Sequence, residues 1–207
     1  MMTEGTLGIT ANMNAAKAEA NTITTAIPSG SIIVQAGGGN KTIPLSRFLP
    51  QEVQIKAGQS VTWYNPSQLP DPHTVTFVFD NQSMTGQFTQ FGISNSTKFK
   101  PLHSSPNSQP VIGYGKNGTN TITAVNARVS DPSVIDTFGN VKVMKPNANY
   151  TMTGTEKYVN SGWLLPKGQE KVFPGSSNIF TLTFKKVGRY DYFCMVHPWM
   201  VGTVIVK

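Results

Sequence analysis

The chain has 207 residues, of which 38% are hydrophobic and 13% are charged, so it is long enough to bury one sizeable core. Its net charge of +7 at pH 7 favours acidic partners or an anionic surface. The basic residues are scattered and do not alternate with aromatic residues, which argues against nucleic-acid binding.

Residues 1–30 are expected to form an N-terminal tail or a short packing helix. The alanine-rich stretch 12–20 has enough helix-forming residues for a few turns, but it has no wide apolar face. No apolar run reaches the length of a signal segment or a membrane span. The sequence therefore predicts neither a targeting segment nor an integral membrane protein.

From residue 31 onward, short runs of alternating apolar and polar residues are separated by Gly, Pro, Ser and Asn. This pattern is typical of an all-β sandwich with few helices. The predicted strands cover residues 31–35, 52–56, 60–65, 73–79, 120–125, 178–185, 189–193 and 201–206. We expect one domain over residues 31–207. The segment from about 81 to 174 is far longer than an ordinary connection and is predicted to be an insertion.

One histidine is expected at the edge of the core. In the predicted strand over residues 73–79, His73 shares a face with Val75, Phe77 and Phe79, and a half-buried sheet turns such a face inward. His103 differs, because it lies in a turn-rich part of the predicted insertion. We expect a solvated or locally hydrogen-bonded ring there, with a gate or an extra ligand as the alternative.

The only cysteine directly follows the predicted strand over residues 189–193, on the inward face of that strand. His197 and Met200 follow Cys194 by three and six residues. A thiolate, an imidazole and a thioether on one tight loop suit a copper ion that cycles between Cu(I) and Cu(II). Because a trigonal copper site takes two histidines and one cysteine, with a weak axial methionine, His73 is the predicted second histidine.

Two other interpretations of these residues compete with a copper site. A buried cysteine, with a histidine or methionine near it, often simply packs, but here four residues and the strand pattern agree. Zinc could bind two imidazoles and a thiolate, although it prefers harder or more numerous ligands than this set offers. Three histidines and one cysteine are too few for a trinuclear or a cysteine-bridged dinuclear centre, so one copper per chain is expected.

Two separated blocks resemble the cupredoxin (blue copper) family, most closely its amicyanin and plastocyanin branch. The first block covers residues 58–65 and the Pro-His-Thr-Val run at 72–75. The second covers residues 188–194, the His-Pro-Trp-Met run at 197–200 and a closing strand over 202–206. The ligand loop of amicyanins reads Cys-x-x-His-Pro-aromatic-Met, and this chain matches every specified position.

The resemblance implies a Greek-key β-sandwich in which Cys194 binds copper as a thiolate. It implies that His73 and His197 bind through Nδ1 and that Met200 lies on the axis. Two further residues are implied to support the ligands without binding the metal, and these are Thr74 and Asn65. Because most cupredoxins are exported, the resemblance also implies an extracytoplasmic setting.

The leading functional hypothesis is a single-electron carrier between redox protein partners. Electrons would pass through the edge of His197, surrounded by Pro198, Trp199 and Met195. A second hypothesis is a redox enzyme that acts on a small molecule such as nitric oxide, at an axial copper position left open by Met200. A third is copper storage or delivery, which predicts a more methionine-rich site. The sequence leaves the oligomeric state open.

Overall fold

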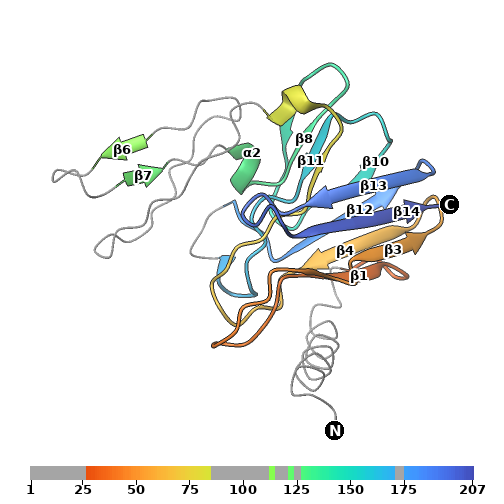
Figure 1. The fold of residues 1–207 in the computed structure, drawn as a ribbon. Coiled ribbons are helices and arrows are strands. Elements are labelled where there is room, and N and C mark those ends of the chain that lie inside the picture. The colour runs from red at the N-terminus through yellow and green to blue at the C-terminus, as the bar shows by residue number, and fades with distance from the viewer. Residues whose placement is uncertain (1–26, 85–111, 115–120, 124–126, 171–174) are drawn as a thin grey trace, which may run out of the picture.

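The computed structural model describes residues 27–84, 112–114, 121–123, 127–170 and 175–207. Within these ranges the chain forms two β-sheets that pack against each other, and a separate two-stranded ribbon (Figure 1). The all-β sandwich predicted from the sequence is therefore confirmed. The predicted helix over residues 12–20 and His103 lie outside the described residues.

The first sheet has the strand order β10-β12-β4-β1-β2. Its strands are β1 (Ile32–Ala36), β2 (Phe48–Leu49), β4 (Ser60–Tyr64), β10 (Asn149–Met152) and β12 (Ile179–Phe184). β4 lies in the middle, parallel to β1 and antiparallel to β12. The Thr62 hydroxyl bonds the Ser31 hydroxyl at 2.8 Å and the Thr181 hydroxyl at 2.9 Å. These cross-strand bonds satisfy polar groups that would otherwise be costly to bury on the outer face of the sheet.

The second sheet has the strand order β3-β14-β13-β5-β11-β8-β9. Its strands are β3 (Glu52–Ile55), β5 (Thr76–Val78), β8 (Ser133–Ile135), β9 (Val141–Val143), β11 (Tyr158–Asn160), β13 (Gly188–Phe193) and β14 (Val201–Val206). β5 lies between β13 and β11. The β13–β14 pair is antiparallel, and the ligand loop predicted from the sequence connects these two strands.

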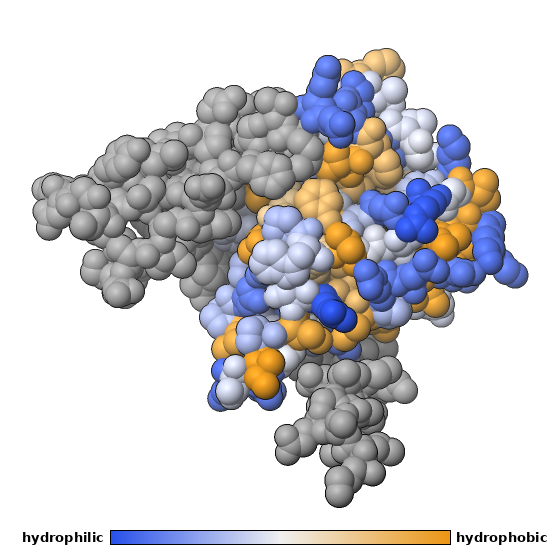
Figure 2. Space-filling model, in the orientation of Figure 1, coloured by the Kyte–Doolittle hydropathy of each residue, from blue (hydrophilic) through white to orange (hydrophobic). Residues whose placement is uncertain are grey.

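The remaining elements are short. β6 (Ile112–Tyr114) and β7 (Thr121–Thr123) pair to form the ribbon, and the described residues also form two helical turns, η1 (Asn81–Met84) and α2 (Ala127–Ser130). In the described part of the chain, no helix is long and apolar enough to span a membrane. On the face in view, hydrophilic and apolar side chains are intermingled (Figure 2).

Aromatic rings from both sheets meet in the core. Successive strands alternate between the sheets, from β3 to β4 to β5 and again from β11 to β12 to β13. This alternation brings Trp63 of β4 against Phe77 of β5 and Tyr192 of β13, with ring centroids 6.0 and 5.3 Å from Trp63. Edge-to-face contacts of this kind stabilise the packing beyond the burial of apolar area alone.

The predicted strands agree with most of the two sheets, with two differences. The strand predicted over residues 73–79 begins only at Thr76, and His73 forms an isolated bridge with Leu164 instead. Six strands were not predicted, namely β2, β6 and β8 to β11. They are two to four residues long, so they carry too little alternation for a period-2 pattern.

Phe77→Ala should lower the free energy of unfolding by about 3–5 kcal/mol, because it leaves a cavity where both sheets meet. Phe77 is fully buried, and the ring of Tyr192 lies 5.1 Å from its own. Urea unfolding of the metal-free protein measures the cost. Phe79→Ala is the matched control and should cost clearly less, since Phe79 is 44% exposed. Equal costs for the two variants would place the centre of the core elsewhere.

Candidate metal centre

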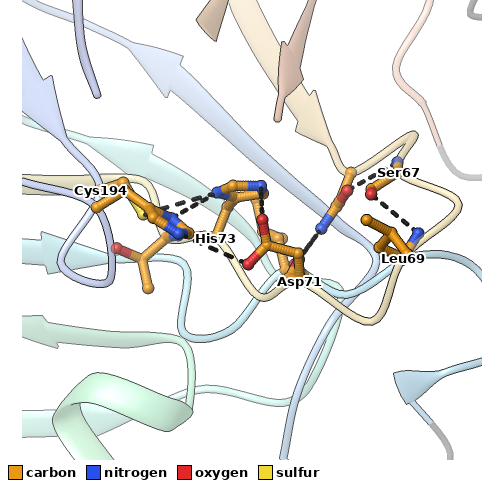
Figure 3. A network of polar contacts seen from close by, with 9 residues as sticks. Ser67, Leu69, Asp71, His73 and Cys194 are labelled. Atoms are coloured by element: carbon orange, nitrogen blue, oxygen red, sulfur yellow. Dashed lines mark hydrogen bonds and ion pairs between the residues drawn. The ribbon is translucent and has the colours of Figure 1, made fainter. Parts of the chain in front are cut away.

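Three side chains with metal-binding atoms converge at one end of the sandwich. His73 lies between β4 and β5, Cys194 directly follows β13, and His197 lies on the loop that leads to β14. The Cys194 Sγ atom is 3.9 Å from His73 Nδ1 and 3.8 Å from His197 Nδ1, and the two Nδ1 atoms are 3.2 Å apart (Figure 3). The structure thus brings together the three residues that the sequence singled out.

The triangle formed by these atoms has the right size for one ion. With sides of 3.2, 3.8 and 3.9 Å, its circumradius is about 2.1 Å, so one point in its plane is equally close to the sulfur and both nitrogens. Bonds from a first-row metal to imidazole nitrogen and thiolate sulfur are about 2.0 to 2.3 Å long. The donor set of one soft sulfur and two nitrogens therefore fits a single transition-metal ion.

His73 is held by the backbone of the segment that follows β11. Its N–H donates to the Leu164 carbonyl at 3.1 Å, and the Leu164 N–H donates to the His73 carbonyl at 2.7 Å. The side chain is fully buried. Burial, together with the positive charge of a protonated His197, lowers the pKa of His73 to about 3. The ring is therefore neutral at ordinary pH and keeps a lone pair for a metal.

Gly37 packs directly against the outer edge of the His73 ring. A β-carbon at this position would lie 2.0 Å from His73 Nε2, which is less than a van der Waals contact allows. The backbone φ of Gly37 is +87°, a conformation that L residues rarely adopt. Both facts require glycine here, although the sequence analysis did not identify the position.

Cys194 is buried, and burial raises the pKa of its thiol in the absence of a metal. The Thr74 N–H points to Cys194 Sγ at 3.3 Å, a contact that opposes this rise because it favours a thiolate. The Thr74 hydroxyl accepts a hydrogen bond from the Met195 N–H at 2.8 Å. Thr74 therefore holds the histidine segment and the cysteine segment in register.

The loop over residues 194–200 is closed by its own backbone. The Cys194 N–H donates to the Met200 carbonyl at 2.9 Å, and the Met200 N–H donates to the His197 carbonyl at 2.8 Å. Met200 is 1% exposed and belongs to the same hydrophobic cluster as Cys194. Its thioether is thus buried with the cysteine, and its role as the axial ligand stays a prediction.

The loop also forms a surface around His197. The His197 side chain is 16% exposed, and the Trp199 ring lies edge-on to it with centroids 5.3 Å apart. Trp199 is 68% exposed, and Pro198 is exposed beside it. Met195 contributes little to this surface, because it is 7% exposed and packs with Trp163 in a separate cluster. The sequence analysis had placed Met195 at the surface, but the segment that follows β11 covers it.

Two polar residues lie in the segment that leads from β4 to His73. Asn65, predicted to support the ligands, donates through Nδ2 to the carbonyls of Asp71 and Leu164 at 2.7 and 2.8 Å. Asp71 was not predicted, yet its carboxylate lies 3.5 Å from His73 Nε2 and 3.6 Å from His197 Nε2 (Figure 3). The signal in the sequence was local, since Asp71 lies two residues before His73 between two prolines.

Comparison with known proteins finds matches only among solved structures. No protein-family model matches the chain, and no curated protein matches it. An amicyanin from Paracoccus versutus (Thiobacillus versutus) is 19% identical, with 87% of this chain and 85% of that one covered and a TM-score of 0.31. A purple cupredoxin from Nitrosopumilus maritimus is 17% identical, with 86% and 100% covered and a TM-score of 0.34.

An amicyanin and a cupredoxin are thus among the solved structures to which this chain is similar. At these identities and TM-scores no residue role is transferred from either protein. The assignment of a function therefore depends on the positions of the ligand atoms.

The stability of the metal-free protein should fall as the pH falls from about 6.5 to about 3, since the unfolded chain protonates His73 there and the native state does not. Linkage sets the slope at no more than about 1.4 kcal/mol per pH unit for this one group. Urea unfolding at a series of pH values measures it, with His73→Gln as the control. Parallel pH dependence in both proteins would show that His73 is not buried in its neutral form.

Proposed function

We propose that this chain is a type 1 copper protein that carries single electrons between redox proteins. One copper ion would be held by His73, Cys194 and His197, with Met200 on the axis. The observation that carries the proposal is the triangle of Sγ and two Nδ1 atoms, which leaves one position about 2.1 Å from all three. A copper ion bound there supplies a one-electron couple between Cu(I) and Cu(II).

The surrounding residues suit electron transfer because they hold the ligands in place. Backbone bonds fix His73 against Leu164 and close the ligand loop between Cys194 and Met200. A site whose ligands cannot move far needs little rearrangement when the charge of the metal changes. The buried, apolar packing around Cys194 and Met200 also limits solvent access, which is one of the factors that set a reduction potential.

The partner surface in this proposal is the patch formed by His197, Pro198 and Trp199, with Val201 beside them. Trp199 and Val201 are 68% and 47% exposed, so the patch is apolar and accessible. Small interfaces of this kind suit redox encounters, which must dissociate quickly. The net charge of +7 favours an acidic partner by long-range attraction.

The proposal also covers the domain organisation and the cellular setting. Residues 31–207 would form one copper-binding domain, with the segment at about 81–174 as an insertion. The setting would be extracytoplasmic, which the resemblance to exported copper proteins supports.

The protein loaded with Cu(II) should bind one copper per chain and absorb strongly in the visible through charge transfer from the Cys194 thiolate. Cys194→Ser should abolish the absorption, because oxygen replaces sulfur at the same place. Azide should leave the band unchanged if Met200 completes the site, whereas a shifted band would favour the small-molecule enzyme. A loaded wild-type protein without colour would contradict the type 1 assignment.

Electron exchange with a small acidic redox protein should slow by about tenfold in Trp199→Ala, because a central apolar contact of about 1.4 kcal/mol is lost. Stopped-flow measurement of the second-order rate tests this. The matched control is Val187→Ala, which removes an exposed apolar side chain from the turn between β12 and β13. If both variants exchange electrons at the wild-type rate with intact visible bands, the patch is not the docking surface.

A further inference from the structure

One carboxylate faces the outer nitrogens of both predicted histidine ligands (Figure 3). Asp71 Oδ2 is 3.5 Å from His73 Nε2, and Asp71 Oδ1 is 3.6 Å from His197 Nε2. Each of the two Asp71 carboxylate oxygens therefore faces a different histidine ring. Among the described residues no group hydrogen-bonds the buried His73 Nε2, and the Asp71 carboxylate, 3.5 Å away, is placed to accept its proton.

The local sequence explains why Asp71 lies beside His73. Pro70 and Pro72 flank Asp71, and a residue before proline is restricted to an extended conformation. In an extended segment, side chains two residues apart point to the same side. Asp71 and His73 are two residues apart, so the backbone itself directs the carboxylate toward the ring.

Hydrogen bonds then fix the Asp71 backbone. Its N–H donates to the Leu69 carbonyl at 2.8 Å, and its carbonyl accepts from Asn65 Nδ2 at 2.7 Å. Asn65 Nδ2 also donates to the Leu164 carbonyl, which accepts the His73 N–H as well. The Leu164 carbonyl therefore anchors both residues, because it accepts from His73 directly and from Asn65, which in turn holds the Asp71 backbone.

The chemistry of imidazole gives this arrangement a consequence. A neutral histidine that binds a metal through Nδ1 must carry its proton on Nε2. A carboxylate that faces Nε2 selects this tautomer, orients the ring and makes Nδ1 a stronger donor. Its negative charge also stabilises the more positive of two oxidation states. In this chain one side chain faces both rings at once.

We propose that Asp71 is the positioning residue for both histidines. Its carboxylate holds the two rings with Nδ1 turned toward the metal, and it shifts the copper couple toward Cu(II). The second effect rests on the proposed copper function. The selection of the tautomer does not, because it concerns the rings alone.

The first test uses the metal-free protein and ¹⁵N NMR of the imidazole rings at a pH where both are neutral. In the wild-type protein both rings should carry the proton on Nε2. Asp71→Asn offers one acceptor oxygen and one donor NH₂ group, so one ring should change to the Nδ1–H tautomer. Asp71→Ala removes both acceptors and should give mixed tautomers in both rings, which provides a second variant if the first does not fold.

The second test measures the reduction potential of the copper-loaded protein. Asp71→Asn should lower the ratio of Cu(II) to Cu(I) affinity at least tenfold, which raises the potential by about 59 mV for a one-electron couple. Asp80→Asn is the matched control, because it removes the same charge from an ion pair with Lys157 beyond the other end of β5. That control should leave the potential and the tautomers unchanged.

The outcomes separate this proposal from the proposed function. Wild-type tautomers and potential in a folded Asp71→Asn protein would overturn the positioning role, even if the visible band of copper is present. A change of tautomer as expected in a protein that binds no copper would support the positioning role and refute the copper function. An equal shift of potential in Asp80→Asn would also overturn the proposal, because it would reduce the effect to net charge.

Discussion

Thr74 joins two segments that are 120 residues apart in the sequence, and the arrangement of the candidate metal site depends on this contact. Its N–H faces Cys194 Sγ, and its hydroxyl accepts the Met195 N–H. Because Thr76 gives its only hydroxyl proton to Asn160 Oδ1, the Thr74 hydroxyl must donate to Thr76 at 2.9 Å. The hydrogen bonds therefore run in one direction through the core. The hydroxyls of Thr74 and Thr76 each donate one hydrogen bond and accept another.

This buried chain of hydrogen bonds continues into the segment predicted as an insertion. Asn160 Nδ2 donates to the carbonyls of Arg128 and Val129 in α2. β11 carries Asn160 and pairs with β5, the strand that follows His73. A fully satisfied polar network in a core is rigid and specifies one arrangement. The network thus connects α2 and β11 to Thr74, next to His73, and holds this part of the candidate site in place.

The parts of the fold and site that could be predicted share one property, which is that their signal is local. The alternation over β4, β12, β13 and β14 is long enough to read directly from the sequence. The short strands β8 to β11 cannot be read from the sequence, because pairing with neighbouring strands stabilises them and their own residues show no clear pattern. Met195 shows the same limit. Its place next to Cys194 predicts a surface position, but Trp163 and Val129 pack against it and bury it.

The sequence by itself determined the spacing of Cys194, His197 and Met200, because seven consecutive residues keep these three side chains near one another. Strand periodicity also indicated the inward direction of His73. Only the tertiary structure decided that Asp71 faces both rings and that Gly37 leaves room for one of them. These contacts join segments from both sheets, and such distances are set by how the sheets pack, which no local pattern of residues encodes.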